Sequence, residues 1–192
     1  MTLASQPRGK ARNNIGVVTC SDVGLRLIQA ADELSPVALL AREYEEWVRG
    51  RILADYGIDP EFKSERDLFL DLDGLREPRA RLYVAEIDGE PVGVGGLRPI
   101  SAHEAEIKRM YVRPSSRGLG VGRAILQRLI DDARALGYTT IHLDSAPFMH
   151  EAHALYRRFG FVPSSPRKGW EFESVPVLHE IAVFMSLDLG AD

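Results

Sequence analysis

The chain has 192 residues, of which 45% are hydrophobic and 27% are charged, and its formal net charge is -4. This length suits one domain with a sizeable core and is short for two. The composition excludes a disordered chain, and the mildly acidic balance argues against a nucleic-acid partner. Because no apolar run approaches the length of a membrane span and the first residues lack the apolar core of a secretory signal, we expect a cytoplasmic protein with no membrane partner.

The beginning of the chain differs from the rest. Residues 1–22 mix Gly, Asn, Ser and Pro with little periodicity and predict a flexible extension, which leaves residues 23–192 as the folded domain. Cys20 is the only cysteine, so it cannot form an internal disulfide and suits a reducing compartment. We interpret it as a small hydrophobic residue rather than a nucleophile.

Apolar spacing predicts the first elements of the domain. Residues 25–30 alternate like a half-buried strand, and residues 32–52 carry apolar side chains at helical spacing with Pro36 in the first turn. A short helix is expected within residues 62–75. Two strand-like runs within residues 81–100 flank Asp88-Gly89, a pair typical of a tight β-hairpin.

The second half predicts a third strand and then strand-helix-strand. Strict alternation in residues 103–112 puts Glu106, Lys108, Met110 and Val112 on one face and Ile107, Arg109 and Tyr111 on the other. Helices are expected in the segments that end at Gly137 and Gly160, with strands at residues 139–145 and 181–189. The apolar faces expected of these two helices are Ile125, Leu129, Ala133 and Leu136, and Ala152, Leu155, Tyr156 and Phe159. The prediction is one mixed α/β domain whose middle is antiparallel.

Residues 109–125, "RMYVRPSSRGLGVGRAI", read as a strand, a glycine-rich turn and a helix start. Backbone N–H groups at such a turn favour an anion, usually phosphate. A Walker loop is excluded because no Lys-Ser or Lys-Thr pair follows the last glycine. A dinucleotide remains an alternative, since Asp144 follows at a suitable distance, but the G-x-G-x-G spacing and the charged preceding strand disfavour it. The glycines could also only shape the turn.

The stretch "EIKRMYVRPSSRGLGVGRAILQRLIDDARALGY" resembles the cofactor motif of the GNAT superfamily of N-acetyltransferases: Gln or Arg, two residues, Gly, one residue, then Gly or Ala. Arg117, Gly120 and Gly122 occupy these positions. "HEAHALYRRFGFVP" resembles the next motif of the family, a helix with an alanine, a tyrosine four residues later, and Gly-Phe after its end. The order of elements resembles the family over roughly residues 25–189.

The resemblance implies a mostly antiparallel mixed sheet with splayed strands, flanked by helices, and acetyl-CoA as acyl donor. The strand before the turn would contribute backbone groups to the pantetheine arm, and the turn would bind the pyrophosphate. The implied cofactor-binding residues are Met110, Tyr111, Val112, Arg117, Gly118, Leu119, Gly120, Val121, Gly122 and Arg123.

The resemblance also implies catalytic residues. Acetyl transfer to an amine needs a neutral nucleophile and a proton for the departing thiolate. Glu106 matches the position of a family glutamate and is the candidate general base, acting through water; the alternative is an ordinary strand-end carboxylate paired with Lys108. Tyr156 matches the family tyrosine and is the candidate general acid, with a core tyrosine as the alternative. Where many members carry an asparagine contact to the cofactor, this chain has Met149.

We therefore expect an acetyl-CoA-dependent N-acetyltransferase that acts on a primary amine, more readily of a small molecule than of a protein, by direct transfer in a ternary complex. The alternatives are a non-catalytic acyl-CoA sensor or partner-binding module and an enzyme that transfers a longer acyl group. No metal is expected, because the spacing of His150 and His153 is one residue short of a zinc peptidase motif. A homodimer is an expectation from relatives alone.

The acceptor is not readable from the sequence. Aromatic and acidic side chains near residue 170 could line its pocket, and acidic residues on the early helices could attract a cationic amine, although such charges are usually a solvated face. These residues are Trp170, Phe172 and Glu173, and Glu43, Glu45, Glu46, Asp67 and Asp71.

Overall fold

The computed structural model describes residues 25–29, 34–57, 59, 74–168 and 181–190. The predicted extension at residues 1–22, Cys20, nearly all of the helix predicted within residues 62–75, and the aromatic residues near position 170 lie outside the described residues. Of the predicted short helix, only its last residues fall in the described part, as a turn of 3-10 helix at Gly74–Arg76.

The strands of the described chain form a seven-stranded sheet in the order β1-β2-β3-β4-β5-β7-β6. Every neighbouring pair is antiparallel except β4 and β5, which run parallel. The strands are β1 Leu25–Gln29, β2 Arg81–Ile87, β3 Glu90–Pro99, β4 Glu104–Val112, β5 Thr140–Ser145, β6 Val162–Pro163 and β7 Val183–Asp188. The helices are α1 Ser35–Tyr56, α3 Val121–Ala135 and α4 His150–Arg158, with 3-10 turns at Gly74–Arg76 and Pro114–Ser116. The predicted mixed α/β class is confirmed.

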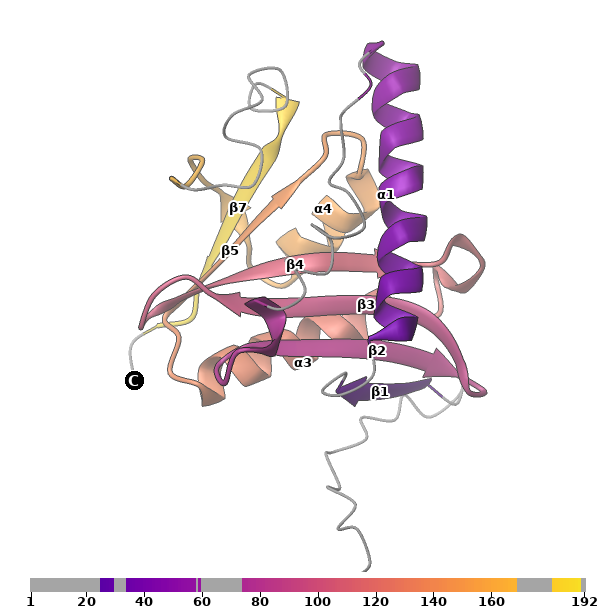
Figure 1. Cartoon of the computed structure of the whole chain (residues 1–192). Helices are drawn as coiled ribbons and strands as arrows, with labels where there is room; N and C mark the ends of the chain where they lie inside the picture. Colours follow the sequence, from indigo (N-terminus) through magenta and orange to yellow (C-terminus); the bar gives the residue numbers. More distant parts are fainter. Residues whose placement is uncertain (1–24, 30–33, 58, 60–73, 169–180, 191–192) are drawn as a thin grey trace, which may run out of the picture.

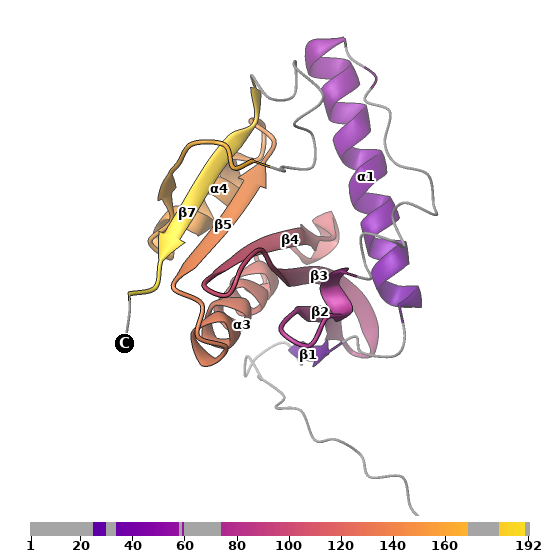
Figure 2. The same cartoon turned by 60° about the vertical axis from the view of Figure 1, so that its left-hand side comes forward.

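The two long helices lie on opposite faces of the sheet (Figures 1 and 2). One buried cluster lies on the α3 side and includes Ile125, Leu129 and Ala133, the stripe expected from the sequence. A second cluster, on the α1 side, includes Val37 and Leu40. The two faces of the sheet are therefore covered by different helices, α3 on one side and α1 on the other.

The hairpin between β2 and β3 forms as predicted. Asp88 and Gly89 have φ values of 53° and 85°, so both central residues of the turn lie in the left-handed region. This is the requirement of the two-residue turn that matches the twist of an antiparallel pair.

A bulge in β4 overturns part of the predicted alternation. Arg109 has a φ of 58°, and the register of β3 against β4 shifts between Val94 and Gly96. Arg109 pairs with Glu45 of α1, whereas Met110 packs in the cluster on the α3 side. The prediction that Met110 and Val112 share a face with Glu106 and Lys108 is therefore wrong, because one extra residue reverses the alternation beyond Lys108.

Candidate active site

The sheet opens between β4 and β5. These strands pair through Glu104, Ala105 and Glu106 of β4. Beyond Glu106, β4 runs on to Val112 and β5 to Ser145, and the two strands diverge (Figure 1). A cavity of about 80 Å³ lies in the opening, lined by α1, the second half of β4, the end of β5 and the start of α4. Parallel strands that separate leave backbone groups facing this cavity, where a ligand can pair with them.

The glycine-rich turn meets the start of α3 beside this opening. Gly118 and Gly120 have φ values of 81° and 82°, a conformation that disfavours any residue with a Cβ. Gly122 has an ordinary φ, and a Cβ there would make only van der Waals contacts at 3.6 Å with Leu155 and Val112. Two of the three predicted glycines are thus required by the backbone of the turn itself, and α3 begins with Val121 directly after them.

The charge at the turn is positive and accessible. Arg117 is exposed, and its Nε donates a hydrogen bond to the Val112 carbonyl at 3.2 Å while its guanidinium lies 5.2 Å from the centre of the Trp47 ring. Arg123 is exposed in the first turn of α3, and Leu119 is exposed in the loop. Exposed N–H groups at a helix start with two arginines fit an anion such as a pyrophosphate.

The strand residues predicted to contact the cofactor lie at the opening. Met110 lines the cavity, and its side chain packs on the α3 side next to Gly95. Tyr111 is buried on the α1 side, and Val112 is half-buried. Their side chains pack in the two hydrophobic clusters on either face of the sheet, so this stretch of β4 can bind a ligand mainly through its backbone groups.

Tyr156 lies in the same cavity. It projects from α4, is 6% exposed and packs against Phe161 with ring centres 5.8 Å apart. Burial raises the pKa of Tyr156 well above its usual value, and electrostatic interactions with Tyr44 and Asp144 raise it further. The hydroxyl therefore stays protonated at neutral pH and is able to donate a proton or a hydrogen bond within the cavity.

A buried serine and histidine lie beside Met149. Ser145 ends β5 and lines the cavity, and its hydroxyl lies 3.1 Å from Nε2 of His153 and 3.4 Å from Sδ of Met149. Burial lowers the pKa of His153, and the nearby Arg157 and His150 lower it further. His153 is thus a neutral core residue that orients Ser145, and the sequence reading of α4, which put only Ala152, Leu155, Tyr156 and Phe159 on the apolar face, missed it.

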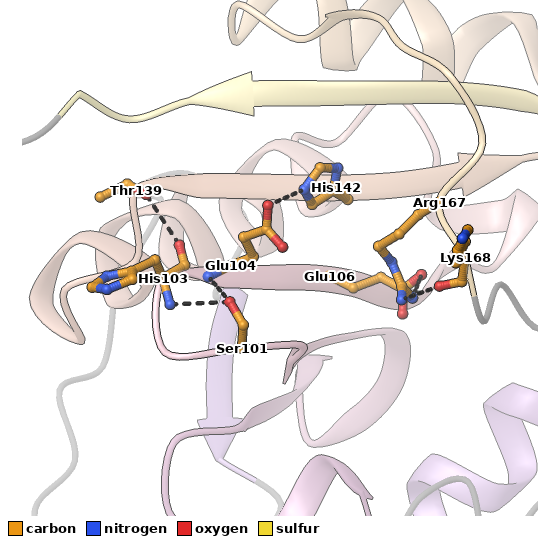
Figure 3. A network of polar contacts seen from close by, with 8 residues as sticks. All are labelled: Ser101, His103, Glu104, Glu106, Thr139, His142, Arg167 and Lys168. Atoms are coloured by element: carbon orange, nitrogen blue, oxygen red, sulfur yellow. Dashed lines mark hydrogen bonds and ion pairs between the residues drawn. The ribbon is translucent and has the colours of Figure 1, made fainter.

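Glu106 is buried but does not line the cavity that contains Tyr156. It is 3% exposed, and its carboxylate lies 2.7 Å from Arg98 Nη2 and 3.4 Å from Arg167 Nη2. Figure 3 shows Glu106 on β4 with Arg167 beside it. Glu106 lines a second, smaller cavity of about 10 Å³. Its partners are these arginines rather than the Lys108 considered from the sequence, because Lys108 faces Asp144, with Nζ to Oδ1 at 3.5 Å.

The acidic residues of α1 have structural partners. Glu43 accepts two hydrogen bonds from Arg113, and Glu45 pairs with Arg109 at 3.1 Å. These ion pairs join α1 to the bulge and to the end of β4. Glu46 is exposed, as a solvated face predicts, and Asp67 and Asp71 lie outside the described residues.

Three residues of the site were not singled out as candidates for acetyl transfer, and Asp144 was considered only for a dinucleotide site. Asp144 and Ser145 line the cavity from β5, and Lys108 lines it from β4. Alternation alone could have placed Asp144 on the face of His142, but the divergence of β4 from β5 depends on long-range contacts that leave no local pattern.

The described residues contain no group of three or more metal-ligating side chains. Within the same residues, no helix is both long enough and apolar enough to span a membrane. His150 and His153 are adjacent on α4, with ring centres 6.3 Å apart, and His153 is engaged with Ser145.

The structure combines a split sheet, a glycine-rich turn at a helix start and a buried tyrosine in the opening, as expected of an acyltransferase from the sequence. The sequence matches the acetyltransferase (GNAT) family over residues 40–161, and the chain belongs to this family.

One relative is similar in sequence, and two solved structures share the fold. An IAA acetyltransferase from Azospirillum brasilense is 36% identical over 106 residues, which cover 55% of this chain and 69% of that protein. A putative acyl-CoA N-acyltransferase from Klebsiella pneumoniae shares the fold with a TM-score of 0.66 at 22% identity, covering 86% of this chain and 98% of that one. A GNAT family acetyltransferase from Elizabethkingia anophelis with acetyl-CoA bound has a TM-score of 0.60 at 20% identity, covering 88% and 100%.

Proposed function

We propose that the protein transfers an acetyl group from acetyl-CoA to a primary amine of a small molecule, by direct attack of the amine in a ternary complex. The observation that carries this proposal is the cavity in the split between β4 and β5, which is lined by Met110 near the end of β4 and by polar side chains of β5 and α4. The residues at the turn fit the cofactor, since exposed N–H groups and Arg117 and Arg123 are suited to a pyrophosphate.

The binding roles follow from the placement of the residues. The backbone of Met110, Tyr111 and Val112 would pair with the pantetheine arm, because β4 has lost its β5 partner there. The N–H groups of the turn, from Gly118 through Leu119, Gly120 and Val121 to Gly122, would hold the phosphates, with the side chains of Arg117 and Arg123 beside them. The N–H of Arg117 itself donates to the Pro114 carbonyl at 3.3 Å. The cofactor supplies an activated thioester when bound.

The proposed catalytic roles are those of Glu106 and Tyr156. Tyr156 is buried, keeps its proton at neutral pH and lines the cavity, which supports its role as donor to the leaving thiolate. The carboxylate of Glu106 pairs with Arg98 and Arg167, and its place in the neighbouring cavity requires that a proton reach it through another group. We propose water for that path.

A small acceptor is supported by the enclosure of the cavity. Its walls come from α1, β4, β5 and α4, and such a concave space buries a compact ligand better than a folded protein surface. The Azospirillum relative is named for a small molecule, IAA, which agrees with this size of acceptor.

Turnover of acetyl-CoA against a panel of polyamines, amino acids, aminoglycosides and peptide amines, with free thiol as the readout, tests the proposal. We expect thiol release that depends on the amine and a matching acetylated product. Binding of acetyl-CoA without release against the whole panel would instead identify a sensor, and preference for larger acyl-CoA substrates would identify a transferase for longer acyl groups.

A further inference from the structure

Three buried side-chain atoms in the described part of the chain have no hydrogen-bond partner: Nε2 of His142, Oδ1 of Asp144 and Nε of Arg167. All three residues line the smaller cavity, together with Glu106. Such atoms are rare in folded proteins. Nε2 of His142 lies 3.6 Å from Oε1 of Glu104, and Oδ1 of Asp144 lies 3.5 Å from Nζ of Lys108, but the space that all three residues share is this cavity. The volume of about 10 Å³ suits about one water molecule, which commonly makes three hydrogen bonds in such a site.

Asp144 connects this cavity to the larger one. Asp144 and Leu143 line both cavities, whereas Glu106 lines the smaller and Tyr156 the larger. The position of Asp144 follows from the pairing of the strands. The last residue of β5 that pairs with β4 is His142, and Asp144 lies two residues further along, on the same face of β5 as His142. Its carboxylate therefore lies where the split begins.

The charges distinguish the two carboxylates. Glu106 is engaged by Arg98 and Arg167, while the charged neighbour of Asp144 is Lys108, with Nζ at 3.5 Å from Oδ1. The negative charge of Asp144 also contributes to the raised pKa of Tyr156, so the electrostatic effect of this carboxylate reaches the Tyr156 hydroxyl. Asp144 is thus placed between the proposed proton donor to the thiolate and the proposed final proton acceptor.

We infer that Asp144 binds the ammonium group of the acceptor and takes its proton, and that a water held by Asp144, His142 and Arg167 passes this proton to Glu106. This inference rests on the proposed function. One proton leaves the ammonium nitrogen for Oδ1 of Asp144 and frees the lone pair that attacks the thioester. The water then accepts the proton from Asp144 as it gives one to Glu106, and Asp144 is again a carboxylate.

The inference predicts a dependence on the basicity of the acceptor. An alkyl amine with a pKa near that of lysine, about 10, is nearly all protonated at pH 7 and needs the base. Trifluoroethylamine is mostly neutral at this pH, because fluorine withdraws electrons, and needs no base for deprotonation. The contribution of Asp144 should therefore be large for the first amine and small for the second.

The test compares Asp144→Asn with wild type on an alkyl amine accepted by the enzyme and on its fluorinated analogue. We expect kcat/KM at pH 7 to fall about 100-fold with the alkyl amine, at the lower end of general-base effects, and less than tenfold with the analogue. Asp188→Asn makes the same chemical change on the neighbouring strand β7, outside both cavities, and should leave both values unchanged. An equal loss with both amines, or no loss, would overturn the inference.

Two further measurements separate chemistry from folding. Asp144→Ala is smaller, and added formate should restore its rate with the alkyl amine, whereas a folded variant that does not respond to formate would contradict the inference. The double variant Asp144→Asn with Glu106→Gln should be no slower than the worse single variant, because the two groups act in series. If the double variant instead lost activity by the product of the two single-variant factors, transfer of the proton from Asp144 through water to Glu106 would be refuted.

These outcomes are distinct from failure of the proposed function. If wild type itself releases no thiol with any amine, the proposed reaction is wrong and the role of Asp144 fails with it. If wild type is active and Asp144→Asn matches it on both amines, only the role of Asp144 is refuted.

Discussion

Gly95 lies on β3 opposite the bulge in β4. Replacing it with alanine tests the packing of α3 and Met110 against β3. A Cβ at this position would lie 2.5 Å from Cγ2 of Ile125 and 2.6 Å from Sδ of Met110. The methionine can turn away, but Cγ2 of Ile125 is attached next to the α3 backbone, so α3 itself would have to shift. Overpacking of this kind costs about 1–3 kcal/mol.

For a chain of this length, such a loss lowers Tm by roughly 2–4 °C per kcal/mol, so Gly95→Ala should melt roughly 2–12 °C below wild type. Displacement of Met110 should also raise the KM for acetyl-CoA. Circular dichroism melts and urea titrations measure the stability, and steady-state kinetics measure the KM.

The matched control is Gly50→Ala. Gly50 is exposed within α1, and a Cβ there would have no neighbour within 4 Å. Alanine in the helix interior should stabilise the protein by about 0.5–1 kcal/mol. A Tm for Gly95→Ala equal to or above that of wild type would show that α3 does not pack against β3 as described.

Three further outcomes follow from the site and its supports. Tyr156→Phe should lower kcat about 100-fold and leave acetyl-CoA binding and Tm close to wild type, and retention of the full kcat would refute its role as proton donor. The lowered pKa of His153 contributes stability that is present above about pH 6.5 and is lost as the pH falls from there through the folded-state pKa. His153→Gln should therefore reduce the loss of unfolding free energy between pH 7.5 and about pH 5, measured by urea titration. A double-mutant cycle on Glu43 and Arg113 should give a coupling of about 0.5–1 kcal/mol, and zero coupling would mean that this pair does not hold α1 to β4.

Local patterns were sufficient to predict most elements of the described fold. The Asp88-Gly89 hairpin, the apolar stripe of α3 and the strand at β5 each depend on short-range spacing, and the structure confirms them. The two-residue strand β6 was missed, because Val162–Pro163 is too short to show a period. The bulge at Arg109 was also missed, since a single inserted residue does not alter the composition of the strand.

By itself the sequence determined the class of fold and the glycine turn before α3, because these depend on residue types at fixed separations along the chain. Its resemblance to the GNAT family supplied the candidate pair Glu106 and Tyr156. Only the tertiary structure decided which groups share a cavity. The loss of pairing beyond Glu106 separates that residue from Tyr156 and puts Asp144 between them. Such sharing depends on long-range contacts, such as those of α1 with β3 and β4 and of α3 with β1 to β4, and these contacts have no signature in neighbouring residues.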